Sequence, residues 1–120
     1  NEYGVTLITT NEAFRERMEP GAAPWERRLA ALRALHDAGY KTWVSIEPFP
    51  TPNIGRQDLR VLLEEVHFVD RIIFGRMNYN TEVTAFAQYK QFFNEKATEV
   101  ITFCNEQGIS CHIKNGTITE

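Results

Sequence analysis

Polar side chains gather where four apolar segments of the chain come to an end. Each segment has the length and composition of a buried strand, and hydroxyl, carboxylate, amide, imidazole or cationic groups stand at or just beyond its carboxyl end. Because the carboxyl ends of parallel strands meet at one edge of a sheet, we expect these groups to form a single site for a polar ligand. The groups belong to Thr9, Thr10, Ser45, Glu47, Arg76, Asn78, His112 and Lys114.

The charged and hydroxyl residues of this set each offer a functional and a structural interpretation. Glu47 could act as a general base, as an acceptor for a cofactor's polar groups or as the partner of an Arg; the alternative is a salt bridge at the sheet edge. Arg76 suits bidentate binding of a carboxylate or phosphate; the alternative is a solvated loop in which Asn78 makes a turn. The hydroxyls of Thr9 and Thr10 either contact a ribose or carboxylate, or cap the helix that follows.

The histidines and cysteines show no spacing typical of a metal site. His112 is the histidine that lies near the expected site, and Lys114 shares its strand face. Cys104 falls on the apolar face of a predicted helix and Cys111 in a predicted strand. We interpret both as buried thiols in a reducing compartment, with a disulfide as the alternative.

Hydrophobic periodicity and turn residues divide the chain into alternating strands and helices. Asn11 and Asp58 are expected to cap helices, Pro24 to begin one and Gly108 to end one. A polar loop is expected from 76 to about 84. The predicted strands are 5–10, 41–48, 69–75 and 109–114, and the predicted helices are 11–18, 24–38, 59–66 and 89–107.

This order predicts an α/β fold of one domain, residues 1–120, with a β-α-β-α-β-α-β parallel sheet. In the second strand, Ser45 and Glu47 project to one face while Val44 and Ile46 project to the other. A strand buried in an open two-sided sheet should be apolar on both faces. We therefore predict an arc, about half of a TIM-like β/α barrel, whose polar inner face needs strands that lie outside this chain.

Composition sets limits on the class of protein. The chain has 120 residues, of which 42% are hydrophobic and 24% charged, and a formal net charge of −3. This charge gives no electrostatic argument for nucleic-acid binding, and no apolar run approaches the roughly 20 residues that span a bilayer. Because the chain does not begin with Met, we expect it to be a fragment of a longer protein. We expect this protein to be located in the cytoplasm.

Three short segments follow one another along the chain. They are Thr9-Thr10 at the end of the first predicted strand, Glu19-Pro20-Gly21-Ala22-Ala23-Pro24, and Ala38-Gly39-Tyr40 just before the next strand. Together with Arg28 and the strand Val44-Ser45-Ile46-Glu47-Pro48, these segments resemble the second half of radical S-adenosylmethionine enzymes. The spore-photoproduct-lyase-like branch is the most similar. The resemblance covers most of the chain and is weaker after Pro52.

The resemblance implies a partial β/α barrel that binds S-adenosylmethionine and a 4Fe–4S cluster and forms a 5′-deoxyadenosyl radical for hydrogen abstraction. The cluster motif Cys-x-x-x-Cys-x-x-Cys is absent here. It is expected in the remaining N-terminal half of the same polypeptide, so the fragment alone is expected to be inactive. The implied cofactor contacts are Thr9 or Thr10, Ser45 and Glu47, and the expected substrate contacts are Arg76, Asn78, His112 and Lys114.

Glu47 departs from the apolar residue that is more usual in the lyase-like branch, so repair of DNA photoproducts is not implied. Two other functions remain open at this point. One is a glycoside hydrolase barrel with Glu47 as acid or nucleophile, which would need a second carboxylate. The other is a non-enzymatic α/β interaction domain with a well-covered sheet. An enzyme fragment would instead expose a sheet face and dimerise or aggregate in isolation.

Overall fold

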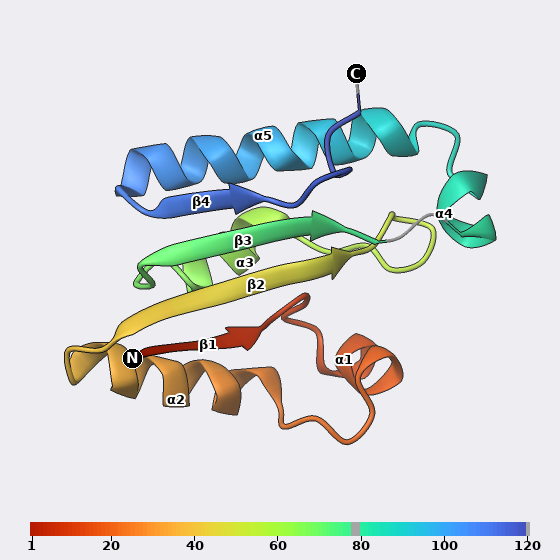
Figure 1. Ribbon diagram of the computed structural model, residues 1–120. Helices are drawn as coiled ribbons and strands as arrows, with labels where there is room; N and C mark the ends of the chain where they lie inside the picture. The colour runs from red at the N-terminus through yellow and green to blue at the C-terminus, as the bar shows by residue number, and fades with distance from the viewer. Residues whose placement is uncertain (78–79, 120) are drawn as a thin grey trace.

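The computed structural model describes residues 1–77 and 80–119. Its centre is a parallel four-stranded sheet in the order β1-β2-β3-β4, an open arc rather than a closed barrel (Figure 1). The predicted α/β class and parallel sheet are therefore confirmed. The strands are β1 (Glu2–Thr6), β2 (Lys41–Phe49), β3 (Arg71–Arg76) and β4 (Ser110–Ile113).

Three helices begin at a residue whose side chain caps them. The side-chain oxygens of Asn11, Asp58 and Asn80 each accept a hydrogen bond from the backbone N–H three residues later, which satisfies a donor that a helix start leaves unpaired. Gly108 ends the last helix with a φ of 70°, a left-handed conformation that suits glycine. The helices are α1 (Glu12–Met18), α2 (Trp25–Asp37), α3 (Leu59–Glu65), α4 (Thr81–Ala85) and α5 (Tyr89–Gln107).

Three features differ from the sequence prediction. The first strand was expected over 5–10, but β1 ends at Thr6, and Thr9 and Thr10 lie in the turn that leads into α1. Strand pairing reaches slightly further, because the Leu7 N–H donates to the Ser45 carbonyl at 2.9 Å. Within the expected polar loop of 76–84, Asn80 caps the short helix α4. Pro24 is the residue before α2 rather than its first residue.

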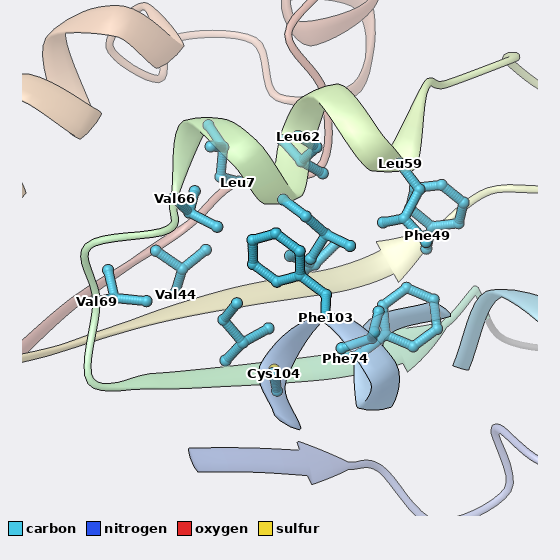
Figure 2. Packing of buried hydrophobic residues seen from close by; sticks show 14 of the residues in the cluster. Leu7, Val44, Phe49, Leu59, Leu62, Val66, Val69, Phe74, Phe103 and Cys104 are labelled. Carbon is cyan, nitrogen blue, oxygen red and sulfur yellow. The ribbon is translucent and has the colours of Figure 1, made fainter. Parts of the chain in front are cut away.

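The helices α2, α3 and α5 pack on the same face of the sheet. Figure 2 shows apolar side chains of α3 and α5 meeting those of β2 and β3. Val44, Ile46, Ile72 and Phe74, from the two central strands, have exposed fractions of 0%. Burial of this face against the helices supplies the main hydrophobic stabilisation of the fold.

The opposite face of the sheet, which we call the open face, carries both polar and apolar side chains and is only partly buried. Trp43, Ser45, Glu47 and Ile73 project from it and are half-buried. A Cβ placed on Gly4 would lie 2.0 Å from the Trp43 ring, so the indole lies directly over this glycine of β1. Parallel sheets are normally covered on both faces, whereas in the described part of the chain the core helices cover one.

Within the ranges 1–77 and 80–119, every helix is too short or too polar to cross a membrane.

We expect Phe74→Ala to lower the free energy of unfolding by about 3–5 kcal/mol, because it leaves a cavity in the core. The Phe74 ring is buried and lies 5.5 Å from the Phe49 ring, centroid to centroid. Urea denaturation followed by circular dichroism measures the change. The control is Val61→Ala on α3, where the side chain is 43% exposed and the expected change is within about 0.5 kcal/mol. Equal effects of the two substitutions would contradict this view of the core.

Candidate active-site edge on the open face

Glu47 and Lys114 meet on the open face at the carboxyl end of the sheet. Glu47 Oε1 lies 3.7 Å from Lys114 Nζ, and their side chains are 36% and 47% exposed. The two residues belong to β2 and to the segment just after β4, so β3 runs between them. The side chains reach each other above Gly75, where a Cβ would lie 2.5 Å from Glu47 Oε2. The absence of a side chain at Gly75 therefore lets Glu47 lie across β3.

A β-bulge sets the position of Glu47. Ile46 pairs with Phe74 and Phe49 pairs with Arg76, so Glu47 and Pro48 together oppose the single residue Gly75. The extra residue reverses the alternation of faces, which is why Ile46 and Phe49 both face the helices. Bulges of this kind commonly lie next to active sites, where they redirect a side chain.

A row of side chains crosses the open face beside this pair. Thr6 is in register with Ser45, Ser45 with Ile73, and Ile73 with His112. The row thus presents two hydroxyls, an apolar side chain and an imidazole in sequence across the sheet. The structure therefore brings Ser45, Glu47, His112 and Lys114 to one face, as the alternation of residues predicts.

Arg76 lies on the opposite, helix-covered face. Its guanidinium is 4.6 Å from the centre of the Phe93 ring and 5.3 Å from that of Tyr89, both on α5. Its Nε donates to the Met77 carbonyl at 3.3 Å, and the residue is 7% exposed. Arg76 therefore joins the end of β3 to α5 and is separated from Glu47 by the sheet. Asn78 lies outside the described residues.

Thr9 is buried in the turn after β1, where its hydroxyl has two structural partners. It donates to Gln57 Oε1 and accepts from the Asn11 N–H at 2.9 Å. This hydroxyl joins the start of α1 to the loop after β2, and a ligand would have to displace these bonds to reach it. Thr10 is half-buried at the same turn.

The Glu-Pro-Gly segment is held by two arginines. Arg28 Nη1 donates to the Thr6 carbonyl at 2.7 Å, and Arg28 Nη2 lies 3.3 Å from Glu19 Oε1. Arg15 Nη1 donates to the Ala22 carbonyl at 2.7 Å. Charge-assisted hydrogen bonds of this kind are stronger than neutral ones. The Glu and Arg on which the family resemblance depends thus fasten the loop to the end of β1.

Cys104 and Cys111 are free thiols that interact with each other between α5 and β4. Burial raises the pKa of the Cys104 thiol to about 12, and the neighbouring Cys111 adds to this rise. Burial also raises the pKa of Cys111, while its hydrogen bond with Cys104 acts in the opposite direction. Cys104 is buried, as predicted, whereas Cys111 is half-buried and packs against the core.

No group of three or more His, Cys, Asp and Glu side chains that could hold a metal ion is found in residues 1–77 and 80–119. A hollow of about 470 Å³ lies away from the open face, between the loop after β2 and α5. It is lined in part by Arg56, Asp58 and Phe92, and none of the predicted site residues lines it.

Comparisons with known proteins give little information on function. No protein-family model and no solved structure matches the chain. The uncharacterized protein ORF301 of Acidianus two-tailed virus is 36% identical to the chain over 62 residues, which are 52% of this chain and 21% of the viral protein. The chain therefore aligns with about a fifth of that protein's length, and the match assigns neither a family nor an activity.

We expect Cys104 of the folded chain to react with iodoacetamide about 1000-fold more slowly at pH 8 than in the unfolded chain, since a pKa near 12 instead of 9.0 reduces the thiolate fraction by that factor. The rate should rise as the pH is raised toward 12. Peptide mass spectrometry measures the alkylation, and the chain in guanidinium chloride is the control. Equal rates for folded and unfolded chains would contradict the burial of this thiol.

Proposed function

We propose that this chain is the C-terminal arc of the β/α barrel of a radical S-adenosylmethionine enzyme, with its open face as part of the barrel lining. The main support is the one-sided sheet, which carries polar side chains at the carboxyl ends of its strands on the face that the core helices leave open. In β/α barrels this face is the interior, and its carboxyl end carries the active site. The resemblance of residues 19–40 to radical S-adenosylmethionine enzymes is the reason for proposing this superfamily.

Cofactor contacts are proposed for the row that runs through Ser45. S-adenosylmethionine presents ribose hydroxyls, an adenine ring, an ammonium and a carboxylate. The hydroxyls of Thr6 and Ser45 lie beside the apolar Ile73 in the strand register. This combination suits a ribose and an adenine, with hydroxyls to exchange hydrogen bonds and an apolar surface beneath the ring. Thr9 and Thr10, in the turn after β1, are proposed to shape the same edge.

The 4Fe–4S cluster does not fit the residues described here, because three cysteine ligands are needed and the two cysteines present pack against each other. The proposal therefore assigns the cluster to the N-terminal half of the polypeptide, which would also cover the open face. In this superfamily, the cofactor and cluster together supply a 5′-deoxyadenosyl radical for hydrogen abstraction. The residues of this chain would bind and orient the cofactor and substrate.

The environment of Glu47 favours this proposal over a glycoside hydrolase. A retaining or inverting hydrolase needs a second carboxylate near the first. In this structure the charged group that faces Glu47 is the ammonium of Lys114. A simple interaction domain is less favoured because it should have a sheet covered on both faces. We further propose a cytoplasmic location, where free thiols such as Cys104 and Cys111 persist.

The test uses the full-length protein that contains this chain, purified without oxygen. We expect it to contain iron and sulfide, to bind S-adenosylmethionine in equilibrium dialysis, and to form 5′-deoxyadenosine when dithionite is added. Chromatography with mass spectrometry detects the nucleoside. A full-length protein that neither holds an iron–sulfur cluster nor binds S-adenosylmethionine would refute the proposal.

A matched pair of variants localises the cofactor to the open face. Ser45→Phe places a large ring in the centre of this face and is expected to abolish S-adenosylmethionine binding without loss of iron. Ser110→Phe makes the same change on the same face, at the exposed amino end of β4, and should leave binding intact. Circular dichroism checks that both variants fold. Equal binding by the two variants would place the cofactor elsewhere.

A further inference from the structure

We propose that Glu47 and Lys114 form a substrate subsite that binds the ammonium and carboxylate groups of an α-amino acid. The inference rests on the proposed function, since that function makes the open face the lining of a barrel and this edge its active site. It goes further by naming the chemical class of the substrate and by assigning Glu47 to the substrate rather than to the cofactor.

The direction of the Glu47 side chain supports this assignment. It crosses Gly75 of β3 and reaches Lys114 just after β4, with Oε1 and Nζ 3.7 Å apart. Among the other predicted cofactor contacts, Ser45 lies on β2 itself, and Thr9 and Thr10 follow β1, on the opposite side of β2 from Lys114. The Glu47 side chain therefore leans away from β1 and toward the strand that carries the expected substrate contacts.

Glu47 and Lys114 can each replace their contact with the other by a contact with a ligand. At 3.7 Å, with both side chains more than one third exposed, their ion pair contributes little to stability. In residues 1–77 and 80–119, no further hydrogen bond or ion pair is found for the Glu47 carboxylate or the Lys114 ammonium. Two acceptor oxygens and three N–H donors thus remain largely available to a bound molecule.

The signs and spacing of the charges define what can bind. A ligand with a single charge would satisfy one partner and separate it from the other, leaving a charge unpaired. A ligand whose ammonium and carboxylate sit on one carbon can place the ammonium against Glu47 and the carboxylate against Lys114. The four charges then alternate in sign around a small ring. Lys114 offers a point charge rather than the fork of an arginine, which suits a carboxylate oxygen held beside an ammonium.

The first experiment uses the full-length protein and the twenty free L-amino acids as probes, with binding detected by saturation-transfer NMR. We expect at least one amino acid to bind. Its amine analogue, which lacks the carboxylate, and its acid analogue, which lacks the ammonium, should each bind about 10- to 100-fold more weakly. If no amino acid binds, or if either analogue binds as tightly as the parent, the inference is wrong.

Variants assign the binding to this pair. Glu47→Gln and Lys114→Gln should weaken binding of that amino acid by about 10- to 100-fold. Gly75→Ala should also weaken it, because the new Cβ displaces the Glu47 carboxylate without removing its charge. The double variant E47K/K114E should bind more tightly than E47K or K114E alone, since it restores one charge of each sign. Binding unaffected by Glu47→Gln and Lys114→Gln would overturn the inference.

The controls are Glu2→Gln and Lys41→Gln. These residues are opposite each other in register on β1 and β2, on the same face but at the amino end of the sheet. Amino-acid binding should be unchanged in both variants, and circular dichroism verifies folding throughout.

The same preparations are assayed for S-adenosylmethionine binding and 5′-deoxyadenosine. If they form 5′-deoxyadenosine but bind no amino acid, the inference fails and the proposed function stands. If they bind an amino acid through Glu47 and Lys114 but hold no cluster and bind no cofactor, the subsite stands and the proposed function fails.

Discussion

When a chain adds each parallel strand beside the previous one, its connecting helices must all return over the same face of the sheet, because such crossovers are right-handed. The strand order β1-β2-β3-β4 imposes this constraint here. The helices α2, α3 and α5 cover one face (Figure 1). Val44, Ile46, Ile72 and Phe74, from the two central strands, are fully buried there. The other face is left open by the same constraint, and the residues that alternate with the core positions, among them Ser45 and Glu47, project there.

On the open face, Gly4 and Gly75 each leave room for a large side chain from β2. The Trp43 ring lies over Gly4 of β1, and the Glu47 carboxylate lies over Gly75 of β3. With a side chain at Gly75, Glu47 would be forced off β3 and away from Lys114. The bulge at Glu47 and Pro48 fixes where this carboxylate leaves the strand. A backbone irregularity and a missing side chain together create the polar edge on which the proposed function depends.

The residues that support the family resemblance have a structural role. Glu19 and Arg28 form an ion pair, and Arg28 also binds the carbonyl of Thr6 at the end of β1. Their interaction fixes the path of the chain from β1 to α2. This loop borders the edge of the sheet that carries the candidate site, so the motif acts by positioning the surrounding elements.

The order of the four strands and of the helices other than α4, the bounds of α5 and the two faces of β2 could be predicted from the sequence, because caps, periodicity and alternation are local properties. The sequence also indicated that Ser45 and Glu47 share a polar face. The folded structure was needed to show that Lys114 is the partner of Glu47, that Arg76 packs against α5, and that the Thr9 hydroxyl is hydrogen-bonded to Gln57, which is distant in the sequence. These outcomes depend on strand register, on a bulge and on contacts between residues far apart in the chain, none of which local spacing specifies.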